Sequence, residues 1–415
     1  MLEFSHTNIR PMTSIAGILD TIFARSGETN KWTIKFFKEI FVLVFSIQGR
    51  VNFENLSRYS KFHECRFRRH FEKFFDWLEF NYRLFYLYGH SAGGVIIAAI
   101  DCSFIPKAGK KTFGLDKFWS GTASRSKKGL ELSVLSLIDV STQRAWTLDA
   151  TQTPAQLRAG EGEQDQYTRI DFYLEQIADC FRKLGDVIYF VADGFYAKTK
   201  VFNFLVQNGK HLITKLRPDA NLRYLFEGTR PKGKRGPKTK YDGKVVYQDI
   251  SRWAVLGSDV KYNHLHLYSK VLNSPAFERN LLVLLVLNTK TNKYILLACS
   301  DTHLCPKTLL CYYQMRFQIE FLFRDAKQFT GLCHCQARDE HKLDFHFNFS
   351  MAAINLARAV QYLNPDFSSM NSFVRRAYNL KLVEWLFEHL SKNAEFDQFH
   401  PDFHKVLDFG AIHST

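Results

Sequence analysis

The chain has 415 residues, 46% of them hydrophobic, which is enough for two or three domains with a sizeable core and excludes a disordered protein. Its 56 Lys and Arg against 41 Asp and Glu leave a net charge of +15, which favours a polyanionic partner, nucleic acid first. The apolar run 281–287 is far too short to span a bilayer, and the N-terminus lacks a secretory signal pattern. We therefore expect a cytoplasmic, nucleoid-associated protein with no membrane partner and with eight cysteines as thiols.

Residues 1–90 are predicted to be helical, with amphipathic stretches at 31–46 and 63–88. A short helix after Asn52 precedes a second one that carries Arg66, Arg68 and Arg69. This order resembles a helix-turn-helix, whose second helix would lie in a major groove. A small helical bundle with a basic surface explains the same pattern, so both interpretations stay open.

A strand pattern begins after residue 94. Strands are predicted at 95–100, ending in Asp101, at 130–140 and at 144–150. A helix at 167–184, a strand at 187–192 ending in Asp193 and a helix at 198–208 follow. This order predicts an α/β fold with mixed strand pairing, in which two strand ends present carboxylates.

The next segment is predicted to be mostly β. Its expected strands cover 211–216, 244–256, 264–271, 281–287 and 294–300. The basic loop 230–240 separates the first two, because its Gly and Pro residues stop a helix or a central strand. Later helices are predicted around Glu320, at 345–363 and at 370–392.

The run 313–327 carries the most informative pattern. Since a helix turns about 100° per residue, one face within roughly 60° of arc carries Tyr313, Arg316, Glu320 and Lys327, with Arg324 beside it. A carboxylate among cations suits a metal ligand that works on a phosphate-rich polymer. An ordinary amphipathic helix with a solvated charged face is the alternative.

Three carboxylates are candidates for a metal site. Phosphodiester cleavage with two divalent ions needs several carboxylates that converge, and Mg²⁺ prefers oxygen ligands. Asp101, Asp193 and Glu320 meet this need if their elements are neighbours, although an Asp at a strand end is more often a turn former or a helix cap. Asp139 is better explained by the polar turn after it, and Asp325 lies about 140° round the helix from Glu320.

The order of these acids and the spacing Tyr-x2-Arg-x3-Glu-x6-Lys, at Tyr313, Arg316, Glu320 and Lys327, resemble the DDE transposases of the insertion sequence 4 family. The resemblance covers about residues 95–360. It implies an α/β fold with an RNase H-like catalytic core, interrupted by a β-rich insertion and flanked by a helical N-terminal DNA-binding region and a helical C-terminal part. The implied boundaries are 1–90, 91–217 for the first part of the core, 218–304 for the insertion, 305–364 for the second part with the Glu helix, and 365–415.

The resemblance also implies cut-and-paste transposition through a DNA hairpin, with Mg²⁺ as cofactor and Mn²⁺ able to replace it. Asp101, Asp193 and Glu320 would hold the ions, while Tyr313, Arg316 and Lys327 would contact DNA phosphates. The implied partners are double-stranded DNA with terminal inverted repeats, target DNA, and a second copy of the chain in the synaptic complex.

Other basic and aromatic residues are further candidates for DNA contact. The segment after Asp101 would contact DNA or form a solvated loop, through Lys107, Lys110, Lys111, Lys117, Arg125, Lys127 and Lys128. The loop 230–240 offers Arg235 and Lys238 to phosphates or a minor groove. In related transposases an aromatic residue of the insertion stacks on a flipped base; Trp253 is the candidate, and core packing is its alternative. Cys333 and Cys335, spaced too closely for a usual zinc site, are interpreted as thiols.

Function classes other than a transposase remain open. A domesticated, non-catalytic DNA-binding protein of transposase origin would keep the fold, and a stand-alone RNase H-fold nuclease would keep the chemistry. An RNA-binding module is a further alternative, but no RRM or KH signature supports it.

Overall fold

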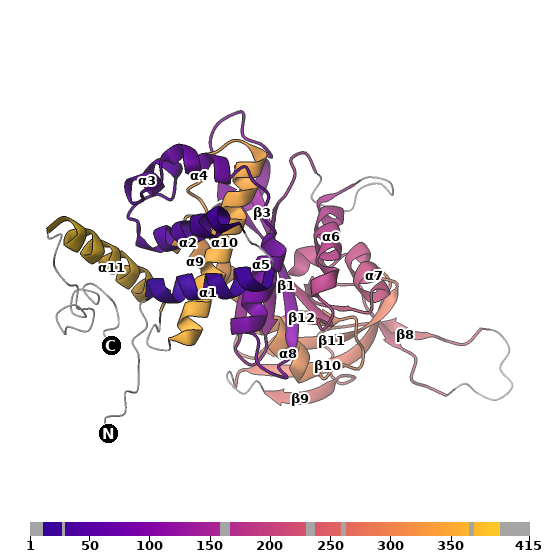
Figure 1. Cartoon of the computed structure of the whole chain (residues 1–415). Coiled ribbons are helices and arrows are strands. Elements are labelled where there is room, and N and C mark those ends of the chain that lie inside the picture. Colours follow the sequence, from indigo (N-terminus) through magenta and orange to yellow (C-terminus); the bar gives the residue numbers. More distant parts are fainter. Residues whose placement is uncertain are drawn as a thin grey trace, which may run out of the picture.

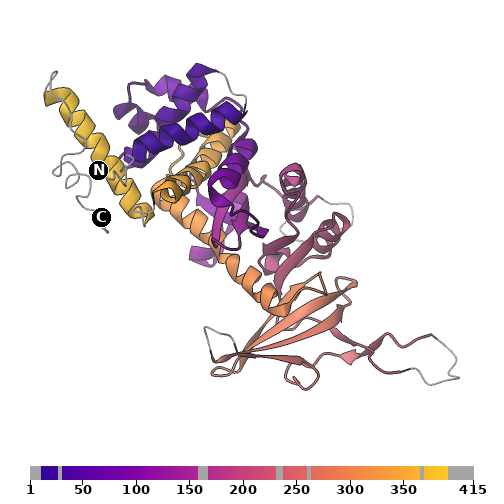
Figure 2. The same cartoon turned by 60° about the horizontal axis from the view of Figure 1, so that its bottom comes forward.

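The computed structural model describes residues 11–26, 30–157, 167–229, 237–258, 263–364 and 369–390. It is a mixed α/β structure built on a twelve-stranded sheet. The N-terminal helices and the last helices of the chain pack together on one side, and the strands of the later β segment lie at the other end (Figure 1, Figure 2). Within the described residues no helix is both long and apolar enough to cross a membrane.

The helices alternate with strands only in the middle of the chain. The helices are α1 Pro11–Ser26, α2 Lys31–Ser46, α3 Phe53–Arg58, α4 Glu64–His70, α5 Trp77–Leu84, α6 Arg169–Asp179, α7 Thr199–Gln207, α8 Pro306–Met315, α9 Phe317–Phe329, α10 Glu340–Leu363 and α11 Met370–Leu390. The strands are β1 Ile96–Pro106, β2 Asp116–Ser120, β3 Arg125–Asp139, β4 Arg144–Gln152, β5 Tyr189–Ala192, β6 His211–Leu216, β7 Arg223–Leu225, β8 Tyr241–Lys244, β9 Ala254–Ser258, β10 Leu265–Ser274, β11 Arg279–Asn288 and β12 Lys293–Cys299.

Five strands form the centre of the sheet, in the order β4-β3-β1-β5-β6. Strands β1, β3 and β4 pair antiparallel, whereas β5 and β6 run parallel to β1. Parallel neighbours need a crossover, which α7 supplies between β5 and β6. The first half of β1 is buried on both faces, as is typical of a strand inside a sheet that is covered on both sides. This topology is compatible with an RNase H-like core.

The β-rich segment continues this sheet. Strand β12 pairs antiparallel with β6, with Ala298 opposite Thr214, and β11, β10, β7 and β8 follow in order. The expected insertion is therefore joined to the central strands by backbone hydrogen bonds along one edge.

Helix α10 connects the N-terminal helices with the sheet. Phe345 and Phe349 on one side share a core with α2, where the ring of Phe41 lies 5.1 Å from that of Phe349. Phe347 and Met351 on the other side share a core with α9. Apolar faces all round explain why a 24-residue helix is stable at the centre of the molecule.

Buried amides fix the register of α10 on β4. Asn355 donates to the carbonyl of Thr147 at 2.8 Å and accepts from its N–H at 3.0 Å. Asn355 also donates to the side chain of Asn81 on α5, at 2.9 Å. Because unpaired buried polar groups are costly, these bonds select one packing of α5, α10 and β4.

The sequence predicted most elements, but several differ, and one of these is the short strand β7, which was not predicted. Asp101 lies in the middle of β1, not at its end, because β1 continues to Pro106 beside β3. The expected strand 244–256 is wrong: β8 ends at Lys244 and β9 begins only at Ala254. The helix expected at 63–88 is broken into α4, α5 and a π-helical turn at Phe85–Gly89. Strand β2 was not predicted.

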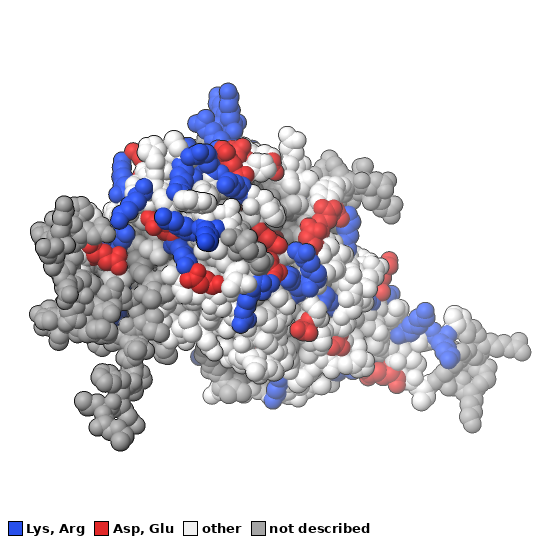
Figure 3. Space-filling model, in the orientation of Figure 1, with Lys and Arg blue, Asp and Glu red and all other residues white. Residues whose placement is uncertain are grey.

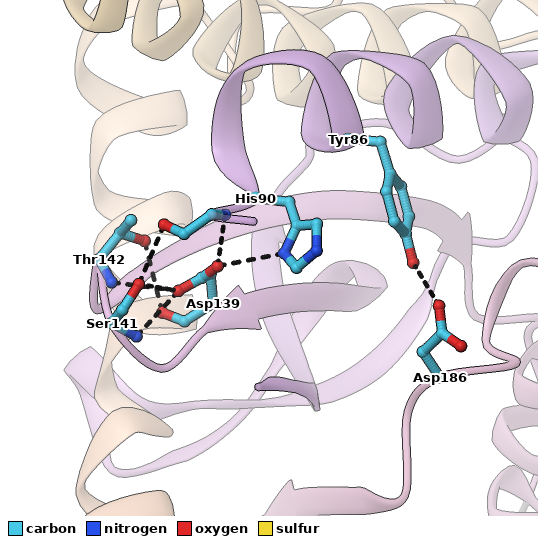
Figure 4. A network of polar contacts seen from close by, with 7 residues as sticks. Tyr86, His90, Asp139, Ser141, Thr142 and Asp186 are labelled. Atoms are coloured by element: carbon cyan, nitrogen blue, oxygen red, sulfur yellow. Dashed lines mark hydrogen bonds and ion pairs between the residues drawn. The ribbon is translucent and has the colours of Figure 1, made fainter. Parts of the chain in front are cut away.

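Asp139 stabilises the end of β3 and the entry into β1 (Figure 4). Its carboxylate accepts the backbone N–H groups of Ser91 at 2.7 Å and Ser141 at 2.8 Å, besides the Ser141 hydroxyl, and lies 3.2 Å from His90 Nδ1. Burial opposes ionisation, but the hydrogen bonds from Ser141 and Ser91 outweigh it and lower the pKa of Asp139. The interpretation of Asp139 as a turn residue agrees with these contacts.

A second contact in the same view joins the N-terminal part to the core. The Tyr86 hydroxyl, in the π-helical turn, reaches Asp186 Oδ2 at 3.5 Å, just before β5 (Figure 4). Burial raises the pKa of Tyr86, so its phenol stays protonated and donates this bond.

We expect Asp139→Asn to lower the free energy of unfolding by about 2 kcal/mol at neutral pH, because an amide cannot accept all of these hydrogen bonds. A carboxyl whose pKa is lowered by folding stabilises the fold above its unfolded pKa and loses that contribution as pH falls through the folded value. The difference from wild type should therefore shrink below about pH 4. Urea unfolding followed at several pH values measures it, and a difference that persists at acidic pH contradicts the assignment.

Candidate active site

Two aspartates lie side by side at the centre of the sheet. Ala99 of β1 is in register with Val191 of the parallel strand β5. Continuing this register by two residues brings Asp101 level with Asp193, which directly follows β5. Side chains two residues apart in a strand point to the same face, so both carboxylates lie on the face of Ala99 and Val191.

Helix α9 covers that same face. Ala99 and Val191 share a core with Ile319 and Leu322 of α9. Glu320 lies in the first turn of this helix, next to these anchors, and its side chain is 46% exposed. The sheet and the helix thus bring the three predicted acids to one place, although 219 positions of sequence separate Asp101 from Glu320.

The run 313–327 is not one continuous helix. Helix α8 ends at Met315 and α9 begins at Phe317, with Arg316 at the break. The Arg316 N–H donates to the Tyr313 carbonyl at 3.1 Å, a tighter turn than an α-helical bond. Arg316 itself keeps helical dihedral angles, with φ −51° and ψ −35°.

Arg316 lies between two of the acids. Its guanidinium contacts Glu320 Oε1 at 2.7 Å through Nη2 and Asp101 Oδ2 at 3.3 Å through Nη1. The residue is only 8% exposed. The resemblance implied a phosphate contact for Arg316, but here its two Nη atoms are taken up by protein carboxylates.

The electrostatics show that the acids are close together. Burial, and then the charge of Asp193, raise the pKa of Asp101 to about 7, against the opposing effect of Arg316. Burial also raises the pKa of Asp193. A carboxyl with its pKa near neutrality, in a group of charges, is typical of a functional site.

Polar contacts position both aspartates. The Asp193 side chain accepts the Phe195 N–H at 2.9 Å, and its carbonyl accepts the Thr214 hydroxyl at 2.7 Å. The Tyr196 hydroxyl lies 3.4 Å from Cys102 Sγ, which ties the turn after Asp193 to β1. We did not predict Thr214 or Tyr196 from the sequence, because single residues without a spacing pattern give no signal.

Of the other predicted residues of the signature, Lys327 joins α9 to the sheet. Lys327 donates to the Ser103 hydroxyl at 2.7 Å and to the Phe104 carbonyl at 3.1 Å, both on β1. Tyr313 is half-buried beside Arg316, and burial raises its pKa. Arg324 is exposed and pairs with Asp325 at 3.0 Å, while Asp325 also faces the buried Arg358 at 3.8 Å.

The donor set fits a divalent cation in its chemistry. Asp101, Asp193 and Glu320 are carboxylates of the kind that bind Mg²⁺, and the Arg316 guanidinium lies between Asp101 and Glu320. In the described part of the chain no three His, Cys, Asp or Glu side chains are arranged closely enough to hold a metal as they stand.

The basic residues predicted to contact DNA are mostly on the surface. Lys110, Lys111, Lys127, Lys128 and Lys238 are exposed. Lys107 instead donates to the carbonyls of Cys335 and Ala337. Arg235 lies outside the described residues.

Further basic side chains belong to the N-terminal helices. Figure 3 shows Lys and Arg gathered over the upper left of the molecule, where Figure 1 places α2, α3 and α4. Helices α3 and α4 have six and seven residues, and Arg68 of α4 pairs with Glu64. A helix followed by a basic helix is confirmed, whereas the helix-turn-helix stays a prediction.

Trp253 is buried, at 4% exposure, within the core of the insertion. It is not available for base stacking in this conformation, so core packing explains this tryptophan.

Comparison with known proteins gives one match. A family model described as DDE superfamily endonuclease matches residues 68–266, which include Asp101 and Asp193 but end before Glu320. No curated protein matched the chain. The match places a DDE superfamily endonuclease domain in this segment, which is consistent with a DDE transposase and indicates nuclease-type activity. Enzymes of this type generally use divalent metal ions.

The raised pKa of Asp101, about 7, makes metal affinity depend on pH. A metal binds the ionised carboxylate, so protons compete with it below this pKa and no longer compete above it. We expect Mn²⁺ affinity to fall up to tenfold per pH unit below about pH 7 and to level off above it. Calorimetric titration across this range measures it; affinity that keeps rising well above pH 8 would point to another group.

We expect Arg316→Gln to tighten Mn²⁺ binding at alkaline pH by about tenfold (~1.4 kcal/mol), because unit charges about 4 Å apart near a protein surface interact by ~4 kcal/mol. Arg324→Gln, about two helical turns after Arg316, is the matched control and should leave the affinity nearly unchanged. Weaker binding by Arg316→Gln would instead show that Arg316 is needed to order the carboxylates.

Proposed function

We propose that the protein is a DNA transposase with an RNase H-like catalytic core, which cleaves and joins phosphodiester bonds at Asp101, Asp193 and Glu320. The observation that carries this proposal is the meeting of two aspartates on neighbouring parallel strands with a glutamate on a covering helix, inside a chain that matches a DDE superfamily endonuclease model.

The three carboxylates would hold divalent ions, Mg²⁺ or Mn²⁺. Bound there, such ions would activate the nucleophile and stabilise the leaving oxygen of the scissile phosphate. The protein's part is to keep the ligands together: Thr214 and Tyr196 hold the turn of Asp193, and Lys327 fixes α9 on β1. Without bound ions, Arg316 stabilises the carboxylates of Asp101 and Glu320. Once ions replace it there, Arg316 would face the negative charge of the substrate.

The substrate we propose is double-stranded DNA with terminal inverted repeats, which is cut and inserted into target DNA by way of a hairpin intermediate. The support is the net charge of +15 and the exposed lysines beyond the carboxylates. A pair of chains bridging the two ends is part of the same proposal. The signature from Tyr313 to Lys327 supports the insertion sequence 4 family.

We expect Asp101→Asn, Asp193→Asn and Glu320→Gln each to reduce DNA cleavage at least a thousandfold, because each removes a charged ligand (~4 kcal/mol). Binding to the end DNA should stay within a few-fold of wild type. Asp325→Asn is the control, since this acid lies on another face of α9. Cleavage assays on DNA that flanks the gene, in Mg²⁺, measure the effect, and normal cleavage by any of the three variants would falsify the site.

A nuclease and a transposase both cleave DNA, but only a transposase then joins the cut end to target DNA. Incubating a pre-cut end with supercoiled plasmid tests strand transfer, because only a transposase joins the 3′ end to the plasmid. Cleavage without joining would identify a stand-alone nuclease, and neither reaction by the wild type would identify a non-catalytic DNA-binding protein.

A further inference from the structure

The hairpin of β2 and β3 extends the sheet beyond the carboxylates. Asp101 is opposite Val134 in the antiparallel pair, and Pro106, the last residue of β1, is opposite Gly129. Beyond that point β3 pairs with β2 alone, with Lys128 opposite Lys117 and Ser126 opposite Trp119. Six residues separate Val134 from Lys128, which corresponds to about 20 Å along the strand, or about six base pairs of DNA.

The outer face of this hairpin is on the same side of the sheet as the active site. Opposite residues of an antiparallel pair share a face, and residues two apart along a strand do so as well. The same face of the sheet therefore carries Asp101, Val134, Lys128 and Trp119. The β1–β3 and β2–β3 registers have no bulge that would change this alternation. A duplex that reaches the carboxylates in the direction of β1 passes over this face.

The composition of this face is unfavourable for folding. Lys117 and Lys128 are both exposed and directly opposite each other, a like-charge pair that destabilises a hairpin. Trp119 beside them is 60% exposed. Among the described residues neither lysine forms an ion pair, and the carboxylate of Asp116 accepts the backbone N–H groups of Lys117 and Gln156.

The inner face of the hairpin carries its stability. Phe118 is fully buried, and the Arg169 guanidinium lies 4.5 Å from the centre of its ring. Arg169 also donates to the Lys117 carbonyl at 3.2 Å. The contacts of Phe118 and Arg169 thus stabilise the hairpin through its inner face, whereas Lys117, Lys128 and Trp119 point away from these contacts.

We propose that the outer face of the β2–β3 hairpin, formed by Lys117, Trp119, Ser126 and Lys128, binds duplex DNA about six base pairs from the scissile phosphate, with Trp119 packed against bases or sugars in a groove. Two opposed cations suit neighbouring phosphates, and an exposed indole beside them suits the apolar surface of the nucleotides. This inference rests on the proposed function and adds a contact that only a duplex extending beyond the cleavage site can make.

Substitutions of Trp119 and of the two lysines separate the contributions of packing and of charge to DNA binding. Binding of a fluorescein-labelled duplex of about 30 base pairs and arbitrary sequence is measured by anisotropy over a range of salt concentrations, without divalent ions. We expect Trp119→Ala to weaken binding about tenfold with an unchanged salt slope, because packing on nucleotides releases no counterions. Trp119→Phe should restore most of the affinity. Lys117→Gln with Lys128→Gln should reduce the salt slope by about 1.8.

Trp385→Ala is the control, since Trp385 is an equally exposed tryptophan on α11, at 54% exposure. The hairpin proposal is overturned if Trp119→Ala binds like Trp385→Ala, or if it changes the salt slope as the lysine variants do. In both cases a wild-type chain that binds and cleaves DNA leaves the proposed function intact. A wild-type chain that neither binds nor cleaves DNA removes the proposed function as well.

Discussion

The structure around the active site depends on the balance between three carboxylates and one arginine. Asp101, Asp193 and Glu320 come from a strand, a turn and a helix, and their negative charges repel one another in a partly buried place. Arg316 contacts Asp101 and Glu320 and so offsets part of this repulsion. Removing Arg316 would leave the partly buried carboxylate of Asp101 without this partner, which is costly.

The N-terminal helices do not form a separate layer that is simply attached to the sheet. They share an aromatic core with α10, and α10 shares its opposite side with α9. A displacement of α10 therefore affects both the basic N-terminal surface and the helix of Glu320. Buried Asn355 limits such displacements, because sliding α10 along β4 breaks its bonds to Thr147 and Asn81 together.

Much of this arrangement could be predicted from the sequence. The strands that lead to Asp101 and Asp193 are β-rich runs, and the spacing from Tyr313 to Lys327 singled out the helix of Glu320. The contact of Arg316 with Asp101 could not be predicted, because helical periodicity places Arg316 beside Glu320 but does not show which strand lies under that face of the helix. The expected strand 244–256 is wrong because its β-prone residues form a turn that packs on the core of the β-rich segment, where Trp253 is buried.

The pairing of β12 with β6 has a consequence for how the catalytic core can exist. Thr214 of β6 lies between Ala192 of β5 and Ala298 of β12, and its hydroxyl also holds the carbonyl of Asp193. Without the inserted strands, β6 would become an open edge with unpaired N–H and C=O groups next to the active site. Such an edge invites strands of other molecules, so a core shortened by this segment would tend to aggregate. The β-rich segment thus acts as a cap on the sheet, which explains how a fold with a parallel edge tolerates an addition of this size between Asp193 and Glu320.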